Sequence, residues 1–144
     1  MKKKLLIIAV IVILAVGLCI YFIQPLKLTE HFSENEVLYI SSTQPVVKNG
    51  SADILMDSYE LEKGTQVYTE VMNLLRDMRM RRTWNTFLDS GSLNGADFYL
   101  SLSDGGAYVI LSSTGEVSVD DHRYILYENT VQQLYDMLPP NSEG

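Results

Sequence analysis

An uninterrupted apolar run near the N-terminus constrains this chain more than any other feature. Residues 5–23 contain no charged side chain, and most of them are Leu, Ile, Val or Ala. As an α-helix, a run of about 19 residues rises roughly 28 Å, which matches the hydrocarbon thickness of a bilayer. Tyr21 and Phe22 stand at its far end, where aromatic rings favour the membrane interface, and Pro25 then ends the helix. The run therefore predicts a single transmembrane helix over residues 5–23.

Two other kinds of N-terminal segment compete with an uncleaved anchor. A cleaved secretory signal needs a small-x-small site, and the Ala-Val-Gly tripeptide at 15–17 fits that pattern locally. Residues 18–23 are still apolar, however, so cleavage there would leave an apolar new terminus. A lipoprotein signal would need a small residue just before Cys19, but Leu18 occupies that position. The sequence favours a signal-anchor that stays in place.

The basic residues around the run predict its orientation. Three lysines occupy positions 2–4, whereas on the other flank Lys27 is the only Lys or Arg before Lys48. By the positive-inside rule, residues 1–4 stay in the cytoplasm and everything after the helix is extracytoplasmic. The predicted location is therefore the cell membrane, with a single pass and an exported C-terminal part.

The exported part is strongly acidic. The whole chain has a formal net charge of −7, and taking away the three leading lysines leaves −10 for the remainder. A bulk charge of this sign repels nucleic acid and anionic lipid headgroups, so nucleic acid is not an expected partner. The only cysteine lies inside the apolar run, which excludes a disulfide framework and a zinc–thiolate site in the exported part.

Three segments are predicted after the helix. Residues 24–35 are polar and show no periodic pattern, which is typical of a stalk between a bilayer and a domain. Residues 36–140 are enough for one small domain, and residues 141–144 form a tail.

Hydrophobic periodicity in the domain predicts the order β-β-α-β-β-β-β-α. Alternating apolar residues indicate six strands, over residues 36–42, 52–61, 96–103, 107–112, 117–119 and 123–127. Turn signals such as Asn49-Gly50 and Asp104-Gly105 join neighbouring strands as hairpins and so make them antiparallel.

Two amphipathic helices complete the pattern. The first begins after Thr65, a residue type that caps helices, and ends near Met80, because continuation would bring Arg82 onto the apolar stripe. The second follows Thr130, which forms a capping box with Gln133, and stops at the prolines that follow residue 138. The predicted fold class is α+β, with one mainly antiparallel sheet and helices packed on one of its faces.

This arrangement resembles small membrane-anchored proteins of Gram-positive bacteria whose exported domain has no assigned function. The resemblance rests on a set of features spread over most of the chain, and no diagnostic motif is among them. They are the lysines at 2–4, the anchor, the segment 58–61 (Ser-Tyr-Glu-Leu) leading into the helix at 67–75, the strand at 98–102, the hairpins and the terminal helix at 131–138. The resemblance implies a bacterial membrane protein and no particular activity.

Residue types that carry catalysis or bind metals are sparse. The only histidines are His31 and His122, and His122 follows two aspartates at a predicted turn. Adjacent strand residues point to opposite faces, so this Asp-Asp-His segment is interpreted as a polar turn and not as a cation site. No Gly-x-Ser-x-Gly elbow or EF-hand spacing occurs. We predict no catalytic residue, metal or cofactor.

Two further clusters have alternative interpretations. Met78 and Met80 resemble the thioether pairs of copper sites, but on a helix they would lie about 200° apart, which favours core packing. Four arginines concentrate half of the exported positive charge. They indicate either a solvated helix end or a site for an anion or an acidic partner. These candidate binding residues are Arg76, Arg79, Arg81 and Arg82.

The leading prediction is a non-enzymatic, extracytoplasmic binding module whose partner is a protein or a component of the cell envelope. One alternative is a cell-envelope hydrolase that uses paired carboxylates, although no particular pair stands out. The other is a structural or sensory subunit of a membrane complex, in which the small residues Ala15 and Gly17 would allow contact with another helix.

Overall fold

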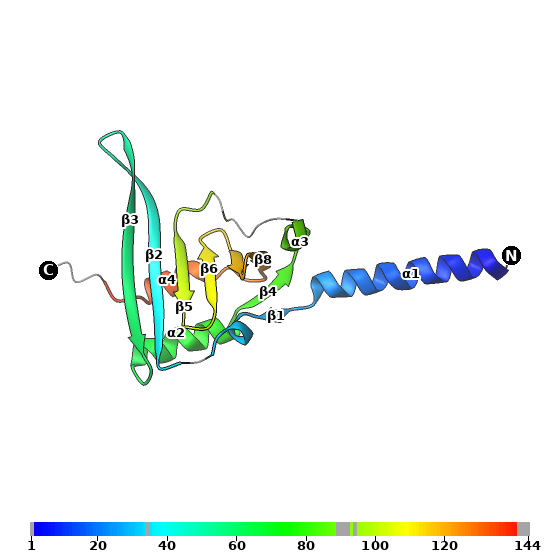
Figure 1. The fold of residues 1–144 in the computed structure, drawn as a ribbon, viewed down its shortest axis with the longest axis horizontal. Helices are drawn as coiled ribbons and strands as arrows, with labels where there is room; N and C mark the ends of the chain where they lie inside the picture. The colour runs from blue at the N-terminus through cyan, green and yellow to red at the C-terminus, as the bar shows by residue number, and fades with distance from the viewer. Residues whose placement is uncertain (1, 34, 89–92, 94, 141–144) are drawn as a thin grey trace.

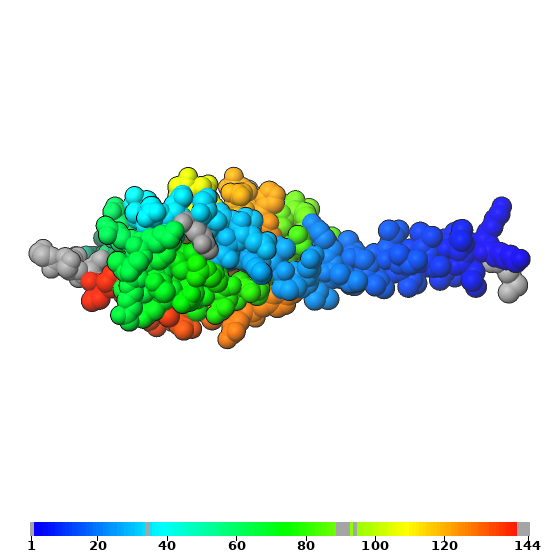
Figure 2. All heavy atoms as spheres, turned by 90° about the horizontal axis from the view of Figure 1, so that it is seen from below, coloured from blue at the N-terminus to red at the C-terminus, as the bar shows by residue number. Residues whose placement is uncertain are grey.

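The computed structural model describes residues 2–33, 35–88, 93 and 95–140, so the predicted tail lies outside the described residues. The N-terminal helix α1 (Lys2–Ile23) extends away from the rest of the protein, and none of its residues is buried (Figures 1 and 2). It is long and apolar enough to cross a membrane, and a signal sequence near an N-terminus has the same properties. The apolar helix predicted from the sequence is present.

All strands in the described part of the chain belong to one eight-stranded antiparallel sheet, which confirms the α+β class. The spatial order of its strands is β1-β4-β8-β7-β6-β5-β2-β3. The strands are β1 (Leu26–Lys27), β2 (Val37–Lys48), β3 (Ser51–Glu62), β4 (Arg79–Arg82), β5 (Tyr99–Ser103), β6 (Tyr108–Ser112), β7 (Glu116–Val119) and β8 (His122–Leu126). The remaining helices are η1 (Leu28–His31), α2 (Gln66–Asp77), α3 (Asn85–Leu88) and α4 (Val131–Asp136).

One face of the sheet forms the core. Alternate residues of the central strands point into it, among them Leu38, Leu100 and Val109, and α2 and α4 cover them with their own buried residues. The inward residues of sheet and helices form a single hydrophobic cluster. The period of 2 in the strands and 3.6 in the helices accounts for this packing, and the prediction of helices on one face is confirmed.

Helix α2 ends at Asp77, three residues earlier than the sequence predicts. The backbone of Met78 is extended, and Met80 then pairs with Leu126 of β8 and with Leu26 of β1. In an extended segment, residues two apart share a face, so the two methionine side chains do not lie about 200° apart, as the predicted helix would place them. Both are nevertheless buried in the core cluster, as expected for Met as a filler of apolar gaps.

The segment predicted as a stalk is part of the fold. Residues 26–27 form edge strand β1, and Leu28 and Phe32 are buried in the core cluster. The backbone N–H of Leu28 also donates to the carbonyl of Met78 at 3.5 Å. The prediction of a free spacer over residues 24–35 is therefore wrong. Its three large apolar residues, Leu26, Leu28 and Phe32, are too few to produce a periodic signal.

Asp104 fastens the end of this segment to the turn between β5 and β6. One carboxylate oxygen accepts the N–H of Gly106 at 3.0 Å and of Ala107 at 3.3 Å, and the other accepts the N–H of Ser33. The turn itself also fits closely, because a Cβ on Gly106 would lie 2.5 Å from Ser33 Oγ. Sequence periodicity gives no hint of this contact between residues about 70 positions apart.

Candidate interaction surfaces

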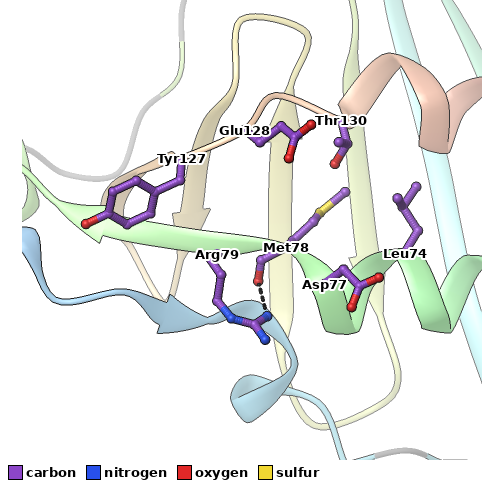
Figure 3. Close-up of a pocket in the computed structure, with 7 residues that line it drawn as sticks. All are labelled: Leu74, Asp77, Met78, Arg79, Tyr127, Glu128 and Thr130. Atoms are coloured by element: carbon purple, nitrogen blue, oxygen red, sulfur yellow. Dashed lines mark hydrogen bonds between the residues drawn. The ribbon is translucent and has the colours of Figure 1, made fainter.

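The four candidate arginines divide between two places. Arg76 lies in the last turn of α2 and bonds to the side chain of Asn73, and Arg79 donates to the carbonyl of Met78 at 3.1 Å (Figure 3). Both cations therefore lie at the C-terminal end of α2, where the helix dipole favours positive charge.

The other two arginines lie farther along β4. Arg82 points to α1, where it donates to the carbonyl of Tyr21 at 3.2 Å and lies 4.1 Å from the centroid of the Tyr21 ring. Arg81 is exposed. A shared binding role for all four arginines stays a prediction.

A small pocket beside the end of α2 contains two carboxylates. Its volume is about 140 Å³, below the roughly 300 Å³ at which ligand sites usually begin. Asp77 and Glu128 line it together with Arg79, Thr130 and three less polar residues, and Figure 3 shows the Met78 side chain between the two acids. An apolar thioether in that position does not favour the paired-carboxylate chemistry of a hydrolase, which needs a sugar and a water between the acids.

The Asp-Asp-His segment forms the tight turn between β7 and β8. Asp120 and Asp121 have positive φ angles of 48° and 64°, and the His122 ring Nδ1 lies 3.0 Å from the carbonyl oxygen of Asp120. Within the described part of the chain, no group of three or more His, Cys, Asp or Glu side chains is placed to hold a metal ion.

The hairpin formed by β2 and β3 projects beyond the sheet. Each strand has twelve residues, and Asn49 and Gly50 join them in a turn with φ angles of 51° and 78°, as the Asn-Gly signal predicts. Strand β5 pairs with β2 only from Tyr39 to Thr43. Beyond Thr43 the two strands therefore continue as a ribbon without a third strand, which is visible as the loop that rises above the domain in Figure 1.

This projecting ribbon exposes apolar side chains. Three consecutive residues of β3 are largely uncovered: Ile54 is 61% exposed, Leu55 44% and Met56 67%. Successive strand residues point to opposite faces, so both faces of the ribbon present apolar surface. Consecutive exposed apolar residues are unfavourable in water, and in natural proteins they usually mark an interaction site.

Strand β3 is also an edge of the sheet. Among the described residues it pairs with β2 only, so the backbone groups on its other side are not used in the sheet. Edge strands are usually protected from unwanted pairing by Lys or Pro. In this hairpin Pro45 and Lys48 belong to β2, whereas β3 contains neither residue type. Asp53 and Asp57 flank its three exposed apolar residues.

The face of the sheet opposite the helices is open and carries a shallow depression. It has a volume of about 470 Å³ and is lined mainly by serines and tyrosines of β2, β3, β5 and β6. A second depression of about 240 Å³ shares Tyr108 with it and reaches Asp120 and Asp121. The open face is therefore a second surface, polar and adjacent to the hairpin.

Comparison with protein-family models, with curated proteins and with solved structures finds no match for this chain. The function is therefore inferred from the geometry of these surfaces.

Proposed function

We propose that this chain is a membrane-anchored, non-enzymatic binding module whose domain lies outside the cytoplasm. Helix α1 would hold it in the bilayer, and the lysines at 2–4 would keep the N-terminus inside. The module would take up an extended segment of a partner protein along the free edge of β3. The observation that carries this proposal is the run of exposed apolar residues on an edge strand that lacks protective Lys or Pro.

Strand addition explains why these features occur together. A strand that pairs with β3 would satisfy its free backbone groups, and its alternate side chains would cover Ile54 and Met56 on one face and Leu55 on the other. Because Asp53 and Asp57 flank this run and the domain is acidic, the favoured partner segment is apolar with basic residues beside it.

The proposal can be tested with the full chain in lipid nanodiscs and a synthetic peptide of alternating Ile and Lys as the probe. Hydrogen exchange is expected to slow at the β3 amides when the peptide binds, because they gain strand partners. The double variant Ile54→Ser, Met56→Ser removes apolar surface that is already exposed. It is expected to weaken binding by about tenfold or more, as is usual for the apolar centre of an interface.

Tyr108→Ser is the control, since Tyr108 is also exposed but belongs to β6, which β5 and β2 separate from the β3 edge. It is expected to leave peptide binding unchanged. Protection that appears in β5 and β6 and is lost in Tyr108→Ser would place binding on the open face and contradict the edge-strand proposal. Protection of β3 that depends on protein concentration without peptide would identify a second copy of this chain as the occupant.

A further inference from the structure

The segment around the short helix α3 exposes large apolar side chains, which is unusual for a surface that faces water. Trp84, just before the helix, is 65% exposed, Phe87 54% and Leu88 80%, whereas of the two polar residues between Trp84 and Phe87, Asn85 is exposed and Thr86 is buried. Thr86 Oγ1 accepts the backbone N–H of Thr83 at 2.8 Å and donates to the carbonyl of Arg123. The turn is therefore fixed to the sheet by its hydroxyl, and its large apolar groups point outward.

These apolar groups lie beside the last turn of α1. The ring centroid of Trp84 is 4.8 Å from that of Phe22, and the Phe87 centroid is 5.9 Å from Phe22 and 6.1 Å from Tyr21. Figure 1 shows α3 at the end of the domain from which α1 leaves. Since Tyr21 and Phe22 end the apolar run, α3 is at the same depth as the end of the hydrophobic segment.

Polar contacts hold α1 and the domain together at this point. Arg82 donates to the carbonyl of Tyr21, and the Tyr127 hydroxyl donates to the carbonyl of Ile23. The last carbonyls of a helix have no partners within the helix, so these two donors satisfy groups that would otherwise need water. Lys27 and Arg81 are exposed in β1 and β4, the two strands at this edge of the sheet.

We infer that Trp84, Phe87 and Leu88 form a second membrane contact, inserted into the interfacial region of the outer leaflet beside α1. The inference rests on the proposed membrane anchoring of α1. The occupant is bilayer lipid, because the patch is continuous with the membrane helix and lies at the level of its aromatic end. Aromatic rings favour this level of a bilayer, and Arg and Lys beside them face the phosphates of the headgroups. Packing against α1 alone does not explain the patch, since Leu88 is its most exposed residue.

The single tryptophan of the chain makes this inference measurable. The full chain would be reconstituted in phosphatidylcholine–phosphatidylglycerol vesicles that contain lipids brominated at different depths. Trp84 emission is expected at short wavelength, with strong quenching by bromines near the headgroup end of the acyl chains and little quenching by aqueous acrylamide. Leu88→Ser and Phe87→Ser are expected to reduce the lipid quenching while the protein still floats with the vesicles.

The control moves the probe to β6, in the middle of the sheet. In the double variant Trp84→Phe, Tyr108→Trp, the only tryptophan replaces an exposed residue of the open face, and we expect acrylamide quenching without lipid quenching. If the wild-type protein floats with the vesicles but Trp84 is quenched by acrylamide and not by lipid, the second contact is overturned and the anchor stands. Trp84 shielded from both quenchers would mean that protein covers the patch, which also overturns it. A chain that does not float with the vesicles removes both proposals.

Discussion

Replacing Leu28 with Ala is expected to lower the free energy of unfolding of the domain by about 2–5 kcal/mol. Leu28 is fully buried, and it lies in the core cluster together with residues of α2 and the sheet. Its removal leaves a cavity that the surrounding side chains fill only in part. The measurement is urea unfolding of the full chain in mild detergent micelles, followed by circular dichroism, in which the midpoint falls and the slope stays the same.

Lys27→Ala provides the control, since Lys27 is the adjacent residue and is exposed. A surface substitution of this kind changes stability by no more than about 0.5 kcal/mol. If Leu28→Ala behaved like Lys27→Ala, the segment after α1 would be a spacer after all, as its polar composition predicts. The comparison therefore tests directly whether the domain begins at β1 or only at β2.

Asp104→Asn is expected to cost about 1–3 kcal/mol at neutral pH, because one carboxylate oxygen becomes an amide that cannot accept a hydrogen bond. Asp104 is buried, and both of its oxygens accept backbone N–H groups. The variant leaves at least one N–H donor, at a part-buried site, without its acceptor. The same urea titration measures the loss, and the exposed Asp97→Asn serves as the control with little expected effect.

The loss in Asp104→Asn should depend on pH in a defined direction. Burial alone raises the pKa of Asp104, but the N–H groups of Gly106, Ser33 and Ala107 outweigh it and hold that pKa below its ordinary value. A lowered pKa means that the carboxylate stabilises the folded state fully above the unfolded value of about 3.9, and this contribution is lost as pH falls through the folded value. The difference between wild type and variant is therefore expected to be constant near neutral pH and to close only in strong acid.

The elements that could be predicted from the sequence are those long enough to show a period. Helices α2 and α4 and the strands from β5 to β8 appear at or within a few residues of their predicted positions. Strand β1 has two residues and β4 has four, of which three are arginines, so neither shows alternation. Helix α3 is a single turn whose position depends on the hydroxyl of Thr86. These short elements depend on contacts with distant parts of the chain.

The candidate surfaces were harder to predict, because exposure is a property of the whole fold. Residues 54–56 belong to a predicted strand, and the sequence does not show that the pairing of β5 with β2 stops at Thr43 and Tyr99, beyond which the hairpin projects. The lack of alternation over these three residues is the one local signal that could have identified it. The arginines attract attention as a charge cluster, yet Arg79 and Arg82 have backbone carbonyls as partners. Trp84 gains its significance only from its contact with Phe22.

The short connection between α1 and the sheet determines how far the β2–β3 hairpin lies from the end of α1. Only Gln24 and Pro25 separate the helix from β1, and β1 and β3 are the two opposite edges of the sheet. Seven spacings of about 4.8 Å between eight strands put β3 roughly 34 Å from β1. In Figure 1 strands β2, β3, β5 and β6 run across the direction of α1. With α1 in a bilayer, the domain would hold β3 at a fixed distance from the membrane surface and roughly parallel to it. A tilt of α1 would change that distance.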